Sequence, residues 1–158
     1  MSSNARHVLV IGYGNPHRQD DRAGHAVAAA VNAWRARDSV PNVTVETAFQ
    51  LDLNMVEDII GASHVFFIDA HLADYSADVE VQEIAPAHAR NFTTHLFTPP
   101  DLMALAHELY GKEPRGWIVS VPGTHFDLSD DMSPHTEEKI TEAAERLIAL
   151  ITGILGEQ

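Results

Sequence analysis

The chain has 158 residues, a length that suits one domain with a single core. Its formal net charge is −13, from 10 Lys and Arg against 23 Asp and Glu, so binding to nucleic-acid phosphates is disfavoured. It contains no cysteine, which excludes disulfides, thiolate metal ligands and a cysteine nucleophile. The 10 histidines and the carboxylates are therefore the available metal ligands.

No targeting or membrane segment is expected. The first apolar stretch is too short for a secretory signal, and no apolar run approaches the roughly 20 residues that span a bilayer. We therefore expect one domain over residues 1–158, in a cytoplasmic protein that acts as a monomer and binds neither membranes nor nucleic acid.

Five short apolar runs rich in β-branched or aromatic residues predict strands over 7–11, 43–47, 64–68, 79–84 and 117–121. The first, third and fifth runs are apolar on both faces, which is typical of strands inside a sheet that helices cover on each side. The fourth run alternates apolar with polar residues. This pattern suits an edge strand and allows an antiparallel one.

Helical periodicity fills the gaps between the strands, over 22–35, 52–60, the segment after Thr98 and the segment after Ser133. Thr98 and Ser133 are each followed by proline, which predicts an N-cap with proline in the first turn. The order of elements predicts an α/β fold. We expect a three-layer α/β/α sandwich with a mostly parallel, twisted sheet of about five strands.

Ionisable residues follow two of the buried strands. Asp20 and Asp21 come after the first strand, Asp69 and His71 at the end of the third, and His95 precedes the third helix. Ligands bind beyond the carboxyl ends of the strands in open α/β sheets. Carboxylates and imidazole from separate loops are a plausible ligand set for nickel, zinc or iron.

Each of these residues also has a purely structural interpretation. Asp20 or Asp21 can cap the helix that begins near Arg22, which stabilises it by about 1 kcal/mol and leaves the other acid free. Asp69 can be a turn residue, and His95 can belong to a surface loop. Spacing alone does not separate these alternatives.

Two glycines follow the first strand. Gly12 and Gly14 suit a positive φ or a close approach of the backbone to a ligand. A dinucleotide fingerprint is disfavoured because position 17, where the third glycine would fall, is histidine, and Pro16 stiffens the loop. The two acids that follow would also repel a phosphate at the helix N-terminus.

Four stretches in order resemble the [NiFe]-hydrogenase maturation endopeptidases, which remove the C-terminal extension of the hydrogenase large-subunit precursor. They are VIGYGNPHRQDDRAGHAV, HVFFIDA, TTHLFTPPDLMALA and GWIVSVPG. The resemblance runs nearly from end to end of the chain. It implies an endopeptidase whose partner is the large-subunit precursor.

The resemblance also implies which residues act. Asp21, Asp69 and His95 match the family's metal-binding and catalytic residues. The resemblance implies that the metal is nickel already inserted in the substrate, so we expect the free enzyme to be metal-free and only a nickel-loaded precursor to be cut. Weaker matches predict a substrate-binding set that comprises Gly12, Gly14, Asn15, Phe49, Gln50 and Leu51.

The chain departs from the family pattern at three places, one of them near Pro122, where Gly123-Thr-His-Phe-Asp127 replaces the usual Pro-Glu type sequence and the roles of His125 and Asp127 stay open. Asp21 stands where relatives often carry glutamate, which is one methylene longer. The sequence after the second strand, Ala48-Phe49-Gln50-Leu51, replaces a common Asp-Gly-x-Thr turn and resembles the branch that serves bidirectional, NAD-linked hydrogenases.

A metal ion can polarise the scissile carbonyl or lower the pKa of bound water from 15.7 towards ~7. No serine lies in a Gly-x-Ser-x-Gly elbow. Two other functions stay open: a nickel-dependent checkpoint that uses the same ligands to bind the precursor without cutting it, and a peptidase or amidase with its own zinc.

Overall fold

The computed structural model describes residues 5–85 and 96–156. Its five strands are β1 (Val8–Tyr13), β2 (Val43–Ala48), β3 (His64–Leu72), β4 (Glu80–Glu83) and β5 (Arg115–Gly123). Its helices are the 3₁₀ turn η1 (Gln19–Arg22), then α1 (Ala23–Arg37), α2 (Met55–Ile60), α3 (Pro99–Tyr110) and α4 (Pro134–Gly156). The predicted order of strands and long helices is confirmed.

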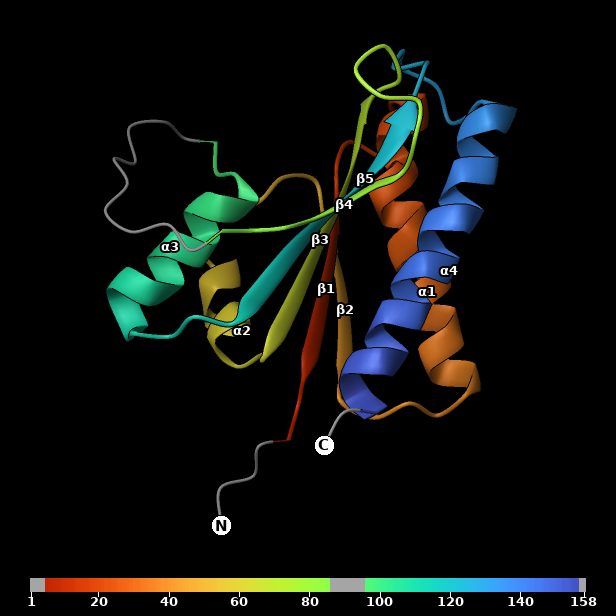
Figure 1. The fold of residues 1–158 in the computed structure, drawn as a ribbon. Coiled ribbons are helices and arrows are strands. Elements are labelled where there is room, and N and C mark those ends of the chain that lie inside the picture. Colours follow the sequence, from red (N-terminus) through yellow and green to blue (C-terminus); the bar gives the residue numbers. More distant parts are fainter. Residues whose placement is uncertain (1–4, 86–95, 157–158) are drawn as a thin grey trace.

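The strands form one sheet in the order β2-β1-β3-β5-β4 (Figure 1). The first four of these positions are joined by parallel pairing, and β4 pairs antiparallel with β5 at the edge. The predicted fold class, a three-layer α/β sandwich with a mostly parallel sheet, is confirmed. The alternating run 79–84 contains the antiparallel edge strand that its pattern allows.

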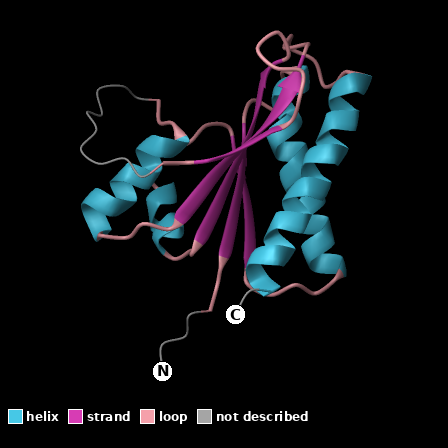
Figure 2. Cartoon of the chain, in the orientation of Figure 1, coloured by secondary structure: helices cyan, strands magenta, loops and turns pink. Residues whose placement is uncertain are grey.

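Helices cover both faces of the sheet, with α1 and α4 on one side and α2 and α3 on the other (Figure 2). The residues of β1 alternate between the two cores, with Val8 and Val10 packed under α1 and α4 and Leu9 and Ile11 under α2 and α3. Burial on both faces explains why this run is continuously apolar. Within residues 5–85 and 96–156, no helix combines the length and apolar character needed to cross a membrane.

Local sequence signals fix the starts of α3 and α4. The Thr98 side chain accepts from the Asp101 N–H at 3.3 Å and the Asp101 side chain accepts from the Thr98 N–H at 2.9 Å, which completes a capping box. At α4, the Ser133 hydroxyl accepts from the Thr136 N–H at 3.3 Å. Both predicted N-caps are confirmed.

The expected acidic cap of the first long helix is wrong. Arg22 is the N-cap residue of α1, and within residues 5–85 and 96–156 no side chain caps either this helix or η1. Asp20 instead accepts hydrogen bonds from the segment between β5 and α4. A long-range contact has replaced the local one that the sequence suggested.

Candidate functional site

The face of the sheet under α2 and α3 becomes polar toward its carboxyl end. Alternate residues of β3 on this face are Phe67, which is buried in the core, then Asp69 and His71. Ser120 of β5 is the pairing partner of Asp69, and Glu80 of β4 pairs with Ser120. A polar row therefore crosses three strands at the end where ligands bind in open α/β sheets.

Asp69 lies inside this row with few hydrogen-bond donors. The Tyr13 hydroxyl donates to Oδ2 of Asp69 at 2.8 Å, and the Ser120 hydroxyl lies 3.4 Å from Oδ1. Burial raises the pKa of Asp69, and the negative charge of Asp21 raises it further; together they outweigh the hydrogen bond from Tyr13, which is the largest contribution that lowers it. The anion of Asp69 is thus disfavoured unless a cation approaches.

Tyr13 completes the surroundings of Asp69. Burial raises the pKa of the Tyr13 hydroxyl, and the charge of Asp69 and its hydrogen bond raise it further. Tyr13 therefore stays protonated and donates to one oxygen of Asp69. Its phenolate form is disfavoured because the negative charge would be buried next to a carboxylate.

Asp21 approaches the same region from η1. Its Oδ2 accepts the N–H of Asn15 at 2.8 Å, and its charge raises the pKa of both Asp69 and Tyr13. The structure therefore brings together two of the three predicted metal-binding residues, Asp21 and Asp69. Two carboxylates whose charges repel each other are suited to a divalent cation.

The loop after β1 holds Asp21 in place. Gly14 has φ 140°, and a Cβ there would collide with the backbone oxygen of Asp21. The Asn15 side chain accepts from the His17 N–H at 2.9 Å, and the His25 ring bonds the Gly14 carbonyl at 2.8 Å. Gly14 and Asn15 thus shape the position of Asp21.

Gly12 has a different role from Gly14. A Cβ at Gly12 would collide with the backbone oxygen of Gly24 and lie 2.8 Å from the Cβ of Ala28. The backbone that approaches Gly12 closely is therefore that of α1. This contact brings the start of α1, and with it η1, to the end of β1.

Asp20 is fully buried and serves the structure rather than the site. Its Oδ2 accepts the N–H groups of Thr124 and His125 at 2.8 and 2.9 Å, and its Oδ1 accepts that of Ser133 at 2.9 Å. Burial alone would raise the pKa of Asp20, but these backbone hydrogen bonds outweigh it and lower the pKa to about 2. The sequence did not reveal this role, because the donors lie more than 100 residues away.

The third predicted ligand, His95, lies outside the described residues. Over the part of the chain that the structure describes, no group of three or more His, Asp or Glu side chains is arranged to hold a metal ion. Asp21 and Asp69 are thus two of the ligands that the resemblance implies, and the position of the third stays a prediction.

The predicted substrate-binding turn after β2 divides into exposed and buried residues. Phe49 is 61% exposed and Gln50 is also exposed, but Leu51 is 3% exposed and packs in the core under α2 and α3. Phe49 and Gln50 are therefore available for contact with another molecule. The side chain of Leu51 contributes to the fold instead.

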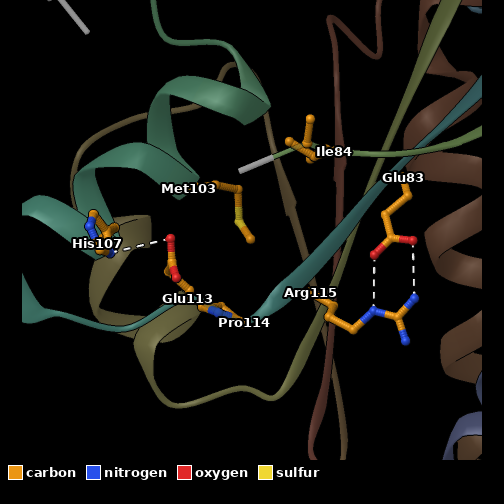
Figure 3. A pocket seen from close by; sticks show the side chains of 8 residues that line it. Glu83, Ile84, Met103, His107, Glu113, Pro114 and Arg115 are labelled. Atoms are coloured by element: carbon orange, nitrogen blue, oxygen red, sulfur yellow. Dashed lines mark hydrogen bonds and ion pairs between the residues drawn. The ribbon is translucent and has the colours of Figure 1, made fainter. Parts of the chain in front are cut away.

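A separate cavity of about 160 Å³ lies between α3 and the β4–β5 pair (Figure 3). Arg115 forms two hydrogen bonds with Glu83, and His107 lies 3.3 Å from Glu113. Ser120 lies five positions after Arg115 on β5, roughly 16 Å along the strand. This cavity is therefore remote from Asp21 and Asp69, and its polar side chains pair with one another.

No protein-family model matches the chain, and no curated protein matches it. Solved structures do share its fold. The hydrogenase maturating endopeptidase HybD from E. coli has a TM-score of 0.71 and 18% identity, over 93% of each chain. The [NiFe] hydrogenase maturation protease HycI from Thermococcus kodakarensis KOD1 has a TM-score of 0.68 and 23% identity, over 98% of this chain and 96% of that one.

A third solved structure gives the same result. The hydrogenase 2 maturation peptidase from Thaumarchaeota archaeon SCGC_AB-539-E09 has a TM-score of 0.66 and 14% identity, over 93% of this chain and 99% of that one. The similarity thus extends over nearly the whole of each protein. The chain has the fold of these hydrogenase maturation proteases, as the resemblance in its sequence implied.

Proposed function

We propose that this protein is an endopeptidase that removes the C-terminal extension of a [NiFe]-hydrogenase large-subunit precursor after nickel has been inserted. The observation that carries the proposal is the meeting of Asp21 and Asp69 at the carboxyl end of the sheet, where Asp69 has a raised pKa and few donors. The shared fold of solved maturation proteases supports it.

The electrostatics of the pair favour a cation that the substrate brings. Without a cation, burial and the charge of Asp21 disfavour the anion of Asp69. A nickel ion held in the precursor would relieve this repulsion, with Asp21, Asp69 and His95 as its ligands in the protease. The same ion can polarise the scissile carbonyl or activate a water molecule.

Exposed apolar side chains on the loops at this end of the sheet fit a protein substrate. Phe49 follows β2, Leu72 and Tyr75 lie at the end of β3, and Leu128 follows β5, with exposed fractions from 61% to 84%. Single exposed apolar side chains are common on protein surfaces, but these four all lie at or after the carboxyl ends of parallel strands, where the candidate site lies. We assign them to contact with the large-subunit precursor, bound by one copy of the protease.

The test compares nickel-loaded and nickel-free precursor. Each is incubated with the purified protein, and the large subunit is then weighed by mass spectrometry. We expect loss of the extension from the nickel-loaded sample only. An intact extension in both samples contradicts the protease function and favours a checkpoint that does not cut, whereas equal cutting of both contradicts nickel recognition.

Metal analysis of the purified protein tests the other alternative, a peptidase or amidase with its own zinc. We expect less than one tightly bound metal ion per chain in the free protein. One zinc per chain that survives dialysis against a chelator, together with cutting of nickel-free precursor, would contradict the proposal.

A further inference from the structure

His71 lies on the same face as Asp69 and has no role in the proposed function. Its two ring nitrogens have different partners. Nε2 lies 2.9 Å from the backbone oxygen of Ser76, and Nδ1 lies 2.7 Å from the hydroxyl oxygen of Ser120. The same hydroxyl oxygen lies 3.4 Å from Oδ1 of Asp69, so Ser120 stands between the two side chains.

The hydrogen bond to Ser76 decides which nitrogen carries the proton. A carbonyl oxygen only accepts, so Nε2 of His71 must donate to it. In the neutral imidazole, Nδ1 is then an acceptor and takes the single hydroxyl hydrogen of Ser120. The shorter distance, 2.7 Å against 3.4 Å, also favours His71 over Asp69 as the acceptor.

Hydrogen bonds rather than packing hold the His71 ring. A cavity of about 320 Å³ opens beside it, lined by His71, Tyr75, Glu80, Gln82, Ile118 and Ser120. Tyr75 contacts the His71 ring edge-on, at 6.2 Å between centroids, and Tyr75 is itself 84% exposed. A substitution that removes the His71 ring nitrogens would therefore free the Ser120 hydroxyl from its hydrogen bond without creating a cavity in the core.

We infer that His71 is a positioning residue that keeps the Ser120 hydroxyl turned away from Asp69, so that Oδ1 of Asp69 stays free to bind the metal ion of the substrate. Tyr13 already occupies Oδ2 of Asp69, so Oδ1 is the oxygen with acceptor capacity to spare. This inference rests on the proposed function and adds a residue to the same site.

Three variants test it. His71→Phe keeps the ring but loses the acceptor, and we expect kcat/KM for nickel-loaded precursor to fall about tenfold, within the range for residues that support metal ligands. His71→Asn offers Oδ1 to the same hydroxyl and should stay within about threefold of wild type. His71→Phe combined with Ser120→Ala has no hydroxyl to turn toward Asp69 and should regain most of the lost activity.

Ser76→Ala is the matched control, because it keeps the backbone carbonyl that His71 contacts. A His71→Phe variant as active as wild type overturns the inference. So does a loss in His71→Phe that removal of the Ser120 hydroxyl does not restore. A purely structural role for His71 predicts no such recovery, because the second substitution would only add to the damage.

A structural measurement separates failure of this inference from failure of the proposed function. In crystals of His71→Phe, we expect the Ser120 hydroxyl oxygen within about 2.8 Å of Oδ1 of Asp69, instead of 3.4 Å. An unchanged distance contradicts the inference even if wild type cuts the precursor. A shortened distance supports it even if wild type proves not to be a protease.

Discussion

The junction around Asp20 and the end of β3 around Asp69 both contain a carboxylate removed from water, and they shift its pKa in opposite directions. Three backbone N–H groups donate to Asp20, and its pKa falls to about 2. The Tyr13 hydroxyl donates to Asp69 at 2.8 Å, and burial raises the pKa of Asp69. Donors, burial and neighbouring charge decide the sign together, because each donor to Asp20 stabilises its anion against the cost of burial, whereas the charge of Asp21 adds to the effect of burial at Asp69.

This difference separates a structural acid from a candidate functional one. N–H groups of the segment between β5 and α4 donate to both carboxylate oxygens of Asp20, and these hydrogen bonds hold that segment against η1. Among the described residues, Oδ1 of Asp69 has only the Ser120 hydroxyl within reach, at 3.4 Å. Asp20 and Asp21 are immediate neighbours in the sequence. Asp20 stabilises the fold, whereas Asp21 belongs to the candidate site.

The largest expected effect is the loss of activity in Asp69→Asn. We expect processing of nickel-loaded precursor to fall by at least about 10³-fold, equivalent to ~4 kcal/mol of activation free energy. The free energy of unfolding should change by less than about 1 kcal/mol, because the fold already disfavours the charged form of Asp69. Single-turnover processing and urea unfolding measure the two quantities.

Asp38→Asn provides the control for that experiment. Asp38 is exposed, follows α1 at the other end of that helix, and pairs with its neighbour Arg37. It should process precursor as wild type does. If the activity of Asp69→Asn were within tenfold of this control, Asp69 would not be a functional residue of the site.

Asp20→Asn should show the opposite of Asp69→Asn, because it should mainly lower the stability of the fold. We expect a loss of about 3 kcal/mol in the free energy of unfolding, because an amide cannot satisfy the three N–H donors that surround Asp20. The lowered pKa means that Asp20 stabilises the fold above its unfolded pKa near 3.8 and loses this contribution as the pH falls toward about 2. Unfolding curves between pH 2 and 7 should therefore converge for wild type and variant at the acid end; parallel curves would contradict the assignment.

Gly12→Ala tests the contact that brings η1 to the sheet. The new Cβ would collide with the Gly24 carbonyl, and we expect a loss of about 2 kcal/mol from overpacking. Gly153→Ala is the matched control, because nothing lies within 4 Å of a Cβ there and α4 should gain up to about 1 kcal/mol. Thermal unfolding measures both; equal stability of the two variants would show that α1 does not need this close approach.

The smallest effect concerns Glu46 on β2, outside both regions. Burial, the hydrogen bond and charge of Asp58, and the charge of Asp52 raise its pKa to about 7. Folding therefore favours the protonated form, so the contribution of Glu46 is most favourable below pH 4.5 and is lost as the pH rises through about 7.

We therefore expect Glu46→Gln to stabilise the protein at pH 8 by up to about 1 kcal/mol, reduced by partial solvent exposure, and to have no effect near pH 4. Glu145→Gln, on the exposed side of α4, makes the same change of charge and is the control. Destabilisation by Glu46→Gln at pH 8 would contradict the raised pKa of Glu46.

The sequence was sufficient to predict the elements, because their signals are local. The continuous apolar runs of β1 and β3 and the capping box at Thr98 each lie within a few residues. Roles fixed by distant partners were not predictable. Neither the buried donors around Asp20 nor the burial of Leu51 leaves a local pattern that distinguishes them from a cap or a surface turn.

The central claim is that Asp21 and Asp69 bind nickel that the precursor carries. Nickel X-ray absorption tests it directly, on nickel-loaded precursor whose scissile residue is replaced by proline to prevent cutting. Addition of wild-type protein should add oxygen ligands to the nickel, and addition of the Asp21→Asn, Asp69→Asn double variant should not. A spectrum that wild-type protein leaves unchanged at saturating concentration would contradict the account.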